Sequence, residues 1–311
     1  MVQTRKKICL LISSAVPGIN NSRIIDWLEQ MPELNIVADI EPVLVFNQEA
    51  VNIGPAVWIK LAEEIKKRLN QFSGFVVLHG TDNLLYTSSA LSFLLPNINK
   101  PVVFTGGPSQ MGTKQPGLKA NLINALQVAS FNFGEVCLMF GNRLLRANQS
   151  SQTKEESLNI FSAPNNATIG RIDFSIRIFE KLVRQSKGPV KLFNKLDTNI
   201  EIIEINPFID FKSLTKIVSG RDGIIINAGC CQNFPEALLS LFEKIDRDIP
   251  IVVWSQVIQG PVLGLKNLIL INNLTWPAAT VKFMWVLSQV RSVVKVKELM
   301  SKDVAGEIMN L

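Results

Sequence analysis

The chain has 311 residues and a mass of 34.6 kDa, and 47% of its residues are hydrophobic against 19% charged. This composition excludes a mainly disordered chain, and the length favours two domains over one. The formal net charge is +6, from 32 basic against 26 acidic residues, but the basic residues are scattered, which argues against a nucleic-acid-binding surface. No apolar run approaches the length needed to cross a bilayer, so we expect no membrane partner.

The ionisable side chains limit the chemistry further. The chain has one histidine and one tyrosine, which argues against a histidine-based metal site or a Ser–His–Asp triad. The four cysteines include the adjacent pair Cys230 and Cys231, which could form a disulfide only with strain. The apolar run at residues 8–12 follows a basic start but is too short for a signal peptide. We therefore expect a reduced, cytoplasmic protein.

The first predicted elements alternate between strand and helix. A strand is predicted at residues 8–12, followed by a helix that Ser22 can cap and that runs to about residue 31. A second strand is predicted at residues 43–46. Pro55 then opens a helix whose apolar residues recur at helical spacing.

The central stretch of the chain is a strand–helix–strand unit. Residues 75–78 and 102–104 are short, wholly apolar runs with a helical segment between them, as expected for two parallel strands buried on both faces. Ligands of open parallel sheets bind at the carboxyl ends of strands, so Thr81 and Asp82, just after the first run, are candidate site residues. His79 is interpreted as a space-filling residue at the strand end.

The remaining elements divide into two groups. A helix is predicted from about residue 117 and a strand at 136–140, before a long polar loop at 141–166 and a linker at 181–199. We expect two α/β domains, residues 1–190 and 191–311. The second domain is predicted from a further α/β alternation, with strands at 200–205, 223–227 and 249–254, and helices near 211–218, 235–244 and 276–290.

The central stretch and several other segments resemble a known family. Residues 74–106 read GFVVLHGTDNLLYTSSALSFLLPNINKPVVFTG, which is similar to the core motif of the bacterial type I L-asparaginases and the related glutaminases. The resemblance covers most of residues 8–290. Further similar segments are PVLVFNQEAVNIGPAVW (42–58), ANLINALQVAS (120–130), LRAN (145–148), FSAPN (161–165), NFPEALLSLF (233–242) and WSQVIQGPV (254–262). The fold that this implies is α/β and asparaginase-like, with a larger Rossmann-like parallel-sheet N-terminal domain and a smaller α/β C-terminal domain.

The resemblance also implies an activity, the hydrolysis of L-asparagine or a related amide to aspartate and ammonia. Such chemistry needs an activated nucleophile, donors for the oxyanion and an anchor for the substrate. In the family, one threonine is the nucleophile, and a second threonine belongs to a base network with an aspartate and a lysine. Thr81 matches the second threonine, and Asp82 matches the aspartate, which also holds the substrate amino group. Both are therefore candidate catalytic residues, and Asp82 is also a candidate for substrate binding, together with Ser13 and Ser14.

Three other family positions are replaced in this chain. The nucleophilic threonine falls on Val16, the substrate-binding serine falls on Ala50, and the catalytic lysine falls on Gln152, with Lys154 two residues away. Removing such groups typically costs several orders of magnitude in rate. Activity by the usual route is therefore expected to be impaired.

Three functional hypotheses remain open. The first is an amidohydrolase that uses a rebuilt site with Ser13, Ser14 or Thr81. The second is a non-catalytic protein that binds an amino-acid-like ligand through Asp82, and the third is a purely structural subunit that pairs with an active relative. No metal or organic cofactor is implied by any of them.

Two expectations concern the arrangement of the site and of the subunits. Thr81, Asp82, Val16 and Ala50 are expected to line one cleft, because each follows a parallel strand. A homodimer or homotetramer is expected from the resemblance and from the densely apolar segment at residues 276–290.

Overall fold

The computed structural model describes residues 5–14, 24–107, 116–153, 159–186, 188–210, 214, 218–231, 233–245, 248–257 and 266–309. The chain divides into two compact units, Met1–Asn194 and Lys195–Leu311. The described residues between the last strand of the first unit and the first strand of the second form no helix or strand. No helix in the described ranges is both long and apolar enough to span a bilayer.

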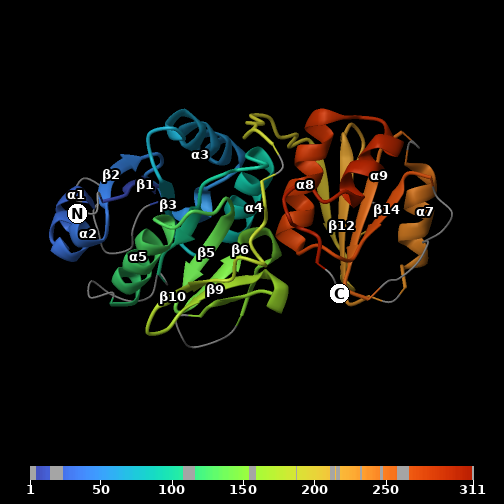
Figure 1. Ribbon diagram of the computed structural model, residues 1–311. Helices are drawn as coiled ribbons and strands as arrows, with labels where there is room; N and C mark the ends of the chain where they lie inside the picture. Colours follow the sequence, from blue (N-terminus) through green and yellow to red (C-terminus); the bar gives the residue numbers. More distant parts are fainter. Residues whose placement is uncertain are drawn as a thin grey trace. The chain divides into compact units, whose positions relative to one another are not determined.

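The first unit contains an eight-stranded mixed sheet in the order β10-β9-β6-β5-β4-β3-β1-β2 (Figure 1). The five strands from β5 to β2 run parallel, and β6, β9 and β10 are antiparallel additions at one edge. The strands are β1 (Lys7–Ile12), β2 (Asp39–Leu44), β3 (Gly74–Leu78), β4 (Val102–Thr105), β5 (Val136–Phe140), β6 (Arg143–Arg146), β9 (Thr168–Ile172) and β10 (Ile176–Ile178).

Helices cover both faces of this sheet (Figure 1). The apolar side chains of α5 form one core with alternate residues of β1, β3 and β4, so that Leu122 belongs to the same cluster as Leu10 and Val103. The opposite face is covered by α3 and α4, which contact each other. The helices are α1 (Ile24–Glu29), α2 (Pro32–Val37), α3 (Pro55–Arg68), α4 (Leu84–Leu94) and α5 (Pro116–Ala129).

The predicted strand–helix–strand unit is confirmed. Every residue of β3 and β4 is buried, and the two strands pair in parallel with Phe75 opposite Val102. Strands covered on both faces by helices must be apolar throughout, which explains why the two runs contain no polar alternation. The fold class is likewise confirmed as α/β with a sheet dominated by parallel strands.

Several predicted elements of the first unit need correction. The second strand spans Asp39–Leu44 rather than 43–46, because it is a half-buried edge strand that tolerates Glu41 and Pro42. The predicted loop at 141–166 contains β6, and also β7 (Ser151–Gln152) paired with β8 (Phe161–Ser162). Such short antiparallel strands carry little periodic signal. The proposed cap Ser22 lies outside the described residues.

The second unit contains a parallel sheet in the order β11-β12-β13-β14. The predicted helix at 276–290 is confirmed as α8, whereas β14 and α9 were not predicted. Most of the predicted helix near 211–218 lies outside the described residues. The elements are β11 (Ile200–Glu204), β12 (Gly223–Gly229), β13 (Ile251–Ser255), β14 (Leu268–Ile271), α7 (Glu236–Lys244), α8 (Trp276–Gln289) and α9 (Val293–Ser301).

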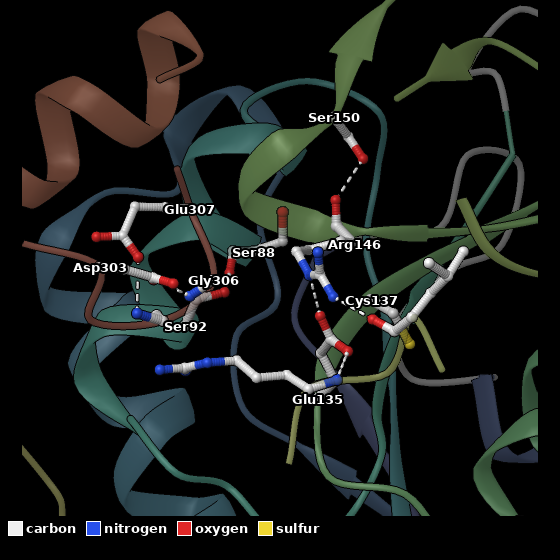
Figure 2. A network of polar contacts seen from close by, with 12 residues as sticks. Ser88, Ser92, Glu135, Cys137, Arg146, Ser150, Asp303, Gly306 and Glu307 are labelled. Carbon is white, nitrogen blue, oxygen red and sulfur yellow. Dashed lines mark hydrogen bonds and ion pairs between the residues drawn. The ribbon is translucent and has the colours of Figure 1, made fainter. Parts of the chain in front are cut away.

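Helix α8 carries a fully buried ion pair between Lys282 and Glu307. The Lys282 ammonium also donates to the carbonyls of Met300 and Lys302, at 2.9 and 2.6 Å. The Glu307 carboxylate accepts the backbone N–H of Ala305 at 2.7 Å, in the C-terminal turn that Figure 2 shows. Because both charges are paired and hydrogen-bonded, the pair fixes the segment after α9 against α8.

The apolar residues of α8 do not by themselves require a second subunit. Val281, Phe283, Trp285 and Val286 are buried within the single chain, and Met284 between them is half-buried. The expectation of a homo-oligomer therefore rests on the family resemblance and not on this helix.

Candidate functional site

The candidate site lies where the carboxyl ends of β1, β2 and β3 meet. Hydrogen bonds continue past the strand ends, since the N–H of Ser13 donates to the Leu78 carbonyl at 3.0 Å and the N–H of Val45 donates to the Ile12 carbonyl at 2.9 Å. The segments that follow the three strands are therefore held side by side at one edge of the sheet.

Ser13 and Ser14 are both buried, and both hydroxyl groups are hydrogen-bonded. The Ser13 hydroxyl donates to the Leu78 carbonyl at 3.0 Å. The Ser14 Oγ accepts the backbone N–H of Gly80 at 2.8 Å. The two serines thus join the segment after β1 to the segment after β3.

Ala50 meets the same turn from the segment after β2. It belongs to a short 3₁₀ helix, η2 (Ala50–Asn52), and is buried. A Cβ added at Gly80 would lie 2.7 Å from the Ala50 Cβ and 3.7 Å from the Ser14 Oγ. Glycine at position 80 is therefore required by the close approach of Ala50, and Gly80, Ser14 and Ala50 converge at one point.

Thr81 and Asp82 lie in the turn between β3 and α4. Thr81 is half-buried and Asp82 is exposed. Asn83 ends the turn in the left-handed conformation, with φ at 55°, and its side-chain amide donates to the Val51 carbonyl at 3.0 Å. Asparagine tolerates this backbone geometry better than most residues, so Asn83 can both close the turn and tie it to η2.

His79 lies directly behind this turn and does more than fill space. It is buried, its Nδ1 lies 2.6 Å from the Gly80 carbonyl oxygen, and its Nε2 lies 3.0 Å from the Thr87 hydroxyl on α4. Burial lowers the pKa of His79 from 6.5 to about 4, and the hydrogen bond to the Gly80 carbonyl opposes that shift. The imidazole is therefore neutral at physiological pH.

The glycine pair after β4 packs against this turn. A Cβ added at Gly106 would lie 2.0 Å from the His79 carbonyl oxygen, so only glycine fits there. The Asn121 side-chain amide donates to the Gly106 carbonyl at 2.8 Å. These contacts support a tight strand exit.

Of the remaining predicted positions, the structure describes Gln152 but not Val16 or Lys154. Gln152 lies on β7 opposite Phe161 and is exposed. Val16 and Lys154 lie outside the described residues, so the predicted cleft is described only through Thr81, Asp82 and Ala50.

Arg146, which precedes the short β7–β8 pair, is held by a buried ion pair with Glu135. Figure 2 shows the two side chains pointing toward each other. Arg146 Nη2 also donates to the Leu182 carbonyl at 2.7 Å, and the second Glu135 oxygen accepts the N–H of Arg184 at 3.1 Å. The Ser150 hydroxyl donates to the Arg146 carbonyl at 2.7 Å. These bonds fix the LRAN segment (145–148) to Glu135, just before β5, and to the chain that follows β10. The role of Arg146 is therefore structural.

Comparison with known proteins identifies the family. The family model described as "Asparaginase, N-terminal" matches residues 13–184, more than half of the chain. The chain belongs to the asparaginase family. This confirms the resemblance found in the central motif.

Individual asparaginases are similar over most of this chain. An L-asparaginase from Thermococcus kodakarensis is 27% identical over 284 residues, covering 87% of each chain. An L-asparaginase from Dirofilaria immitis is 29% identical over 269 residues, which cover 81% of this chain but only 46% of that longer protein. The crystal structure of L-asparaginase I from Vibrio cholerae O1 biovar eltor superimposes with a TM-score of 0.83 at 27% identity, covering 99% of this chain and 100% of the other. The asparaginase fold therefore extends over both units.

Some polar contacts of the site could not be predicted from the sequence. The hydrogen bond between Ser14 and Gly80 joins residues 66 positions apart, and no local sequence pattern predicts it. Asn83, directly before an apolar helical run, is a position where a local signal existed, because asparagine is enriched in left-handed turns.

Proposed function

We propose that this asparaginase-family chain binds L-asparagine or a related amide at the carboxyl edge of the first sheet, and that it hydrolyses this ligand to aspartate and ammonia only slowly. The observation that carries the proposal is the turn after β3. By resemblance Thr81 and Asp82 match two site positions of the family motif, and the turn that contains them packs against the segments that follow β1 and β2. Asp82 is exposed, so its carboxylate is available to a ligand ammonium group.

Slow hydrolysis follows from the side chains at the replaced positions. The Val16 side chain has no oxygen to act as nucleophile. At position 50, where the family has a serine hydroxyl, Ala50 has only a methyl group, which packs close to Gly80. Gln152 carries no charge and cannot serve as the basic member of a proton-transfer network. The three losses act on one reaction, so we expect their combined effect to be large.

The alternative is a non-catalytic homologue that binds an amino acid or has a structural role. One observation favours it. Ser13 and Ser14, which could replace the nucleophile, both have hydroxyls engaged with the strand ends. The single histidine could not activate them, because its two ring nitrogens contact Gly80 and Thr87.

The wider biological setting is proposed on the resemblance. We propose a cytoplasmic homodimer or homotetramer that takes a small amino-acid or amide ligand and requires no metal or organic cofactor. The similar proteins of Thermococcus kodakarensis and Dirofilaria immitis are both L-asparaginases, which supports L-asparagine or a related amide as the ligand.

An ammonia-release assay with L-asparagine and L-glutamine, run beside calorimetric binding of both amino acids, tests the proposal. We expect saturable binding of one of them, with ammonia release far below ordinary enzyme turnover, which is about 10 per second. Turnover near that value would contradict the impaired-site proposal. Absence of binding would contradict the proposed ligand and favour the structural alternative.

A further inference from the structure

His79 is the one histidine in the chain, and its ring joins the two ends of the turn at residues 80–83. On one side of the ring, Nδ1 meets the carbonyl of Gly80, where the turn begins. On the other side, Nε2 meets the hydroxyl of Thr87, one turn into α4. The Thr87 hydroxyl also lies 3.1 Å from the Asn83 carbonyl, where the turn ends.

These partners determine which ring nitrogen carries the proton. A carbonyl oxygen only accepts, so the 2.6 Å contact with Gly80 requires a proton on Nδ1. In the neutral ring Nε2 is then an acceptor and receives the hydroxyl proton of Thr87. That proton is shared between Nε2 and the Asn83 carbonyl, because a hydroxyl group has one proton to donate.

The surroundings of the ring keep it neutral. The neighbouring elements β3, α4 and β4 carry no charged side chain, and Tyr86 is the one ionisable group of α4. The ring of Phe104 lies 6.0 Å away, between centroids. Asp82 is the nearest carboxylate along the chain, and it is exposed. An imidazolium would therefore lose its hydration without gaining a buried counter-charge.

We propose that His79 is a positioning residue for the ligand-binding turn, residues 80–83: as a neutral imidazole protonated on Nδ1, it holds the Gly80 carbonyl and the first turn of α4 so that Asp82 faces the ligand. This inference rests on the proposed function, since it assigns His79 to the same site. It differs from a packing role, because a residue that only fills space would not require a particular tautomer.

The first test is nitrogen NMR of the full-length protein with labelled histidine. The chain contains one histidine, so its signals need no assignment. We expect the Nδ1–H tautomer at pH 7, although a neutral histidine side chain exposed to water favours the Nε2–H tautomer. The Nε2–H tautomer or an imidazolium at pH 7 would overturn the proposal.

The second test uses variants of the histidine itself. His79→Leu removes both ring contacts, whereas His79→Asn keeps an N–H donor near the position of Nδ1. We expect His79→Leu to weaken L-asparagine binding about ten-fold, which is roughly the net contribution of one hydrogen bond, and His79→Asn to recover part of that loss. Equal binding by the wild type and His79→Leu would contradict a positioning role.

Thr87 gives a milder test in case His79→Leu does not fold. Thr87→Val removes the hydroxyl with little change of shape, and Thr87→Ser retains it. Ser92→Ala is the matched control, because it removes a buried hydroxyl of the same helix that donates to the Ser88 carbonyl and not to the turn. We expect Thr87→Val alone to weaken binding. Equal losses in Thr87→Val and Ser92→Ala would contradict the proposal.

Amide hydrogen exchange separates this inference from the proposed function. If the wild type binds no L-asparagine, the proposed function fails. The effect of the two His79 hydrogen bonds is still measurable, as protection of the backbone amides of residues 80–84 from exchange. We expect this exchange to be at least about ten-fold faster in His79→Leu than in the wild type or in Ser92→Ala. Unchanged exchange would overturn the positioning role whatever the ligand result.

Discussion

Acidification should destabilise the protein through His79 in a defined pH window. The pKa of His79 is about 4 in the folded chain, against the ordinary value of 6.5 that applies to the unfolded chain. Below pH 6.5 the unfolded state therefore binds a proton that the folded state does not, and stability falls as the pH falls. Between pH 6.5 and 4 the linkage relation gives a loss of about 2 kcal/mol by pH 5 and about 3 kcal/mol by pH 4.

The assay compares urea unfolding of the wild type and His79→Asn at several pH values between 7 and 4. Other groups titrate in this range in both proteins, so the difference between the two curves isolates His79. We expect the wild type to lose about 3 kcal/mol more than the variant by pH 4. Parallel curves, or a histidine NMR signal that titrates near pH 6.5 in the folded protein, would refute the argument from burial.

Three further predictions concern the site, the second unit and assembly. Combining Val16→Thr, Ala50→Ser and Gln152→Lys should raise the rate of ammonia release from L-asparagine. Each single change should recover little activity, because members of a catalytic group act as a unit. A triple variant no faster than the wild type would show that more than these three side chains has been lost. Lys282→Met should destabilise the protein by about 3 to 5 kcal/mol in urea unfolding, because Glu307 is left as an unpaired buried charge. The additional change Glu307→Leu should restore much of that loss, and no recovery would argue against the ion-pair explanation. Light scattering at micromolar concentration should give a mass of at least twice 34.6 kDa, and a mass near that of one chain would exclude the proposed homo-oligomer.

The central part of the fold could be predicted because its sequence signals are local and strong. The strands β3 and β4 are uninterrupted apolar runs, and α4 between them leads directly from one to the other. Burial on both faces forces this composition, so the run of apolar residues alone identifies the unit.

Other strands could not be placed in the same way. β2 is a half-buried edge strand with Glu41 and Pro42 inside it, which resembles a loop in sequence. β6, β7 and β8 are short strands stabilised by pairing with other segments, which no local pattern encodes.

The candidate site could be located from the sequence only in part. Thr81 and Asp82 are candidates because they follow a buried parallel strand, where ligands of such sheets bind. The hydrogen bonding of His79 depends on Thr87, eight residues later, and on a helix that places the two side chains together. The predicted location at the strand ends came from local sequence, whereas the hydrogen bonds that shape the turn came from the fold.

The central claim, a ligand site built on Asp82, is tested most directly by calorimetric titration of L-asparagine into the wild type and Asp82→Asn. Glu63→Gln is the matched control, because it removes one exposed negative charge from the same unit on α3. We predict saturable binding by the wild type and the control, and a loss of at least about ten-fold in Asp82→Asn, since a charge-assisted bond to the ligand ammonium is removed. Equal affinity in all three proteins, or binding by none of them, would contradict the claim.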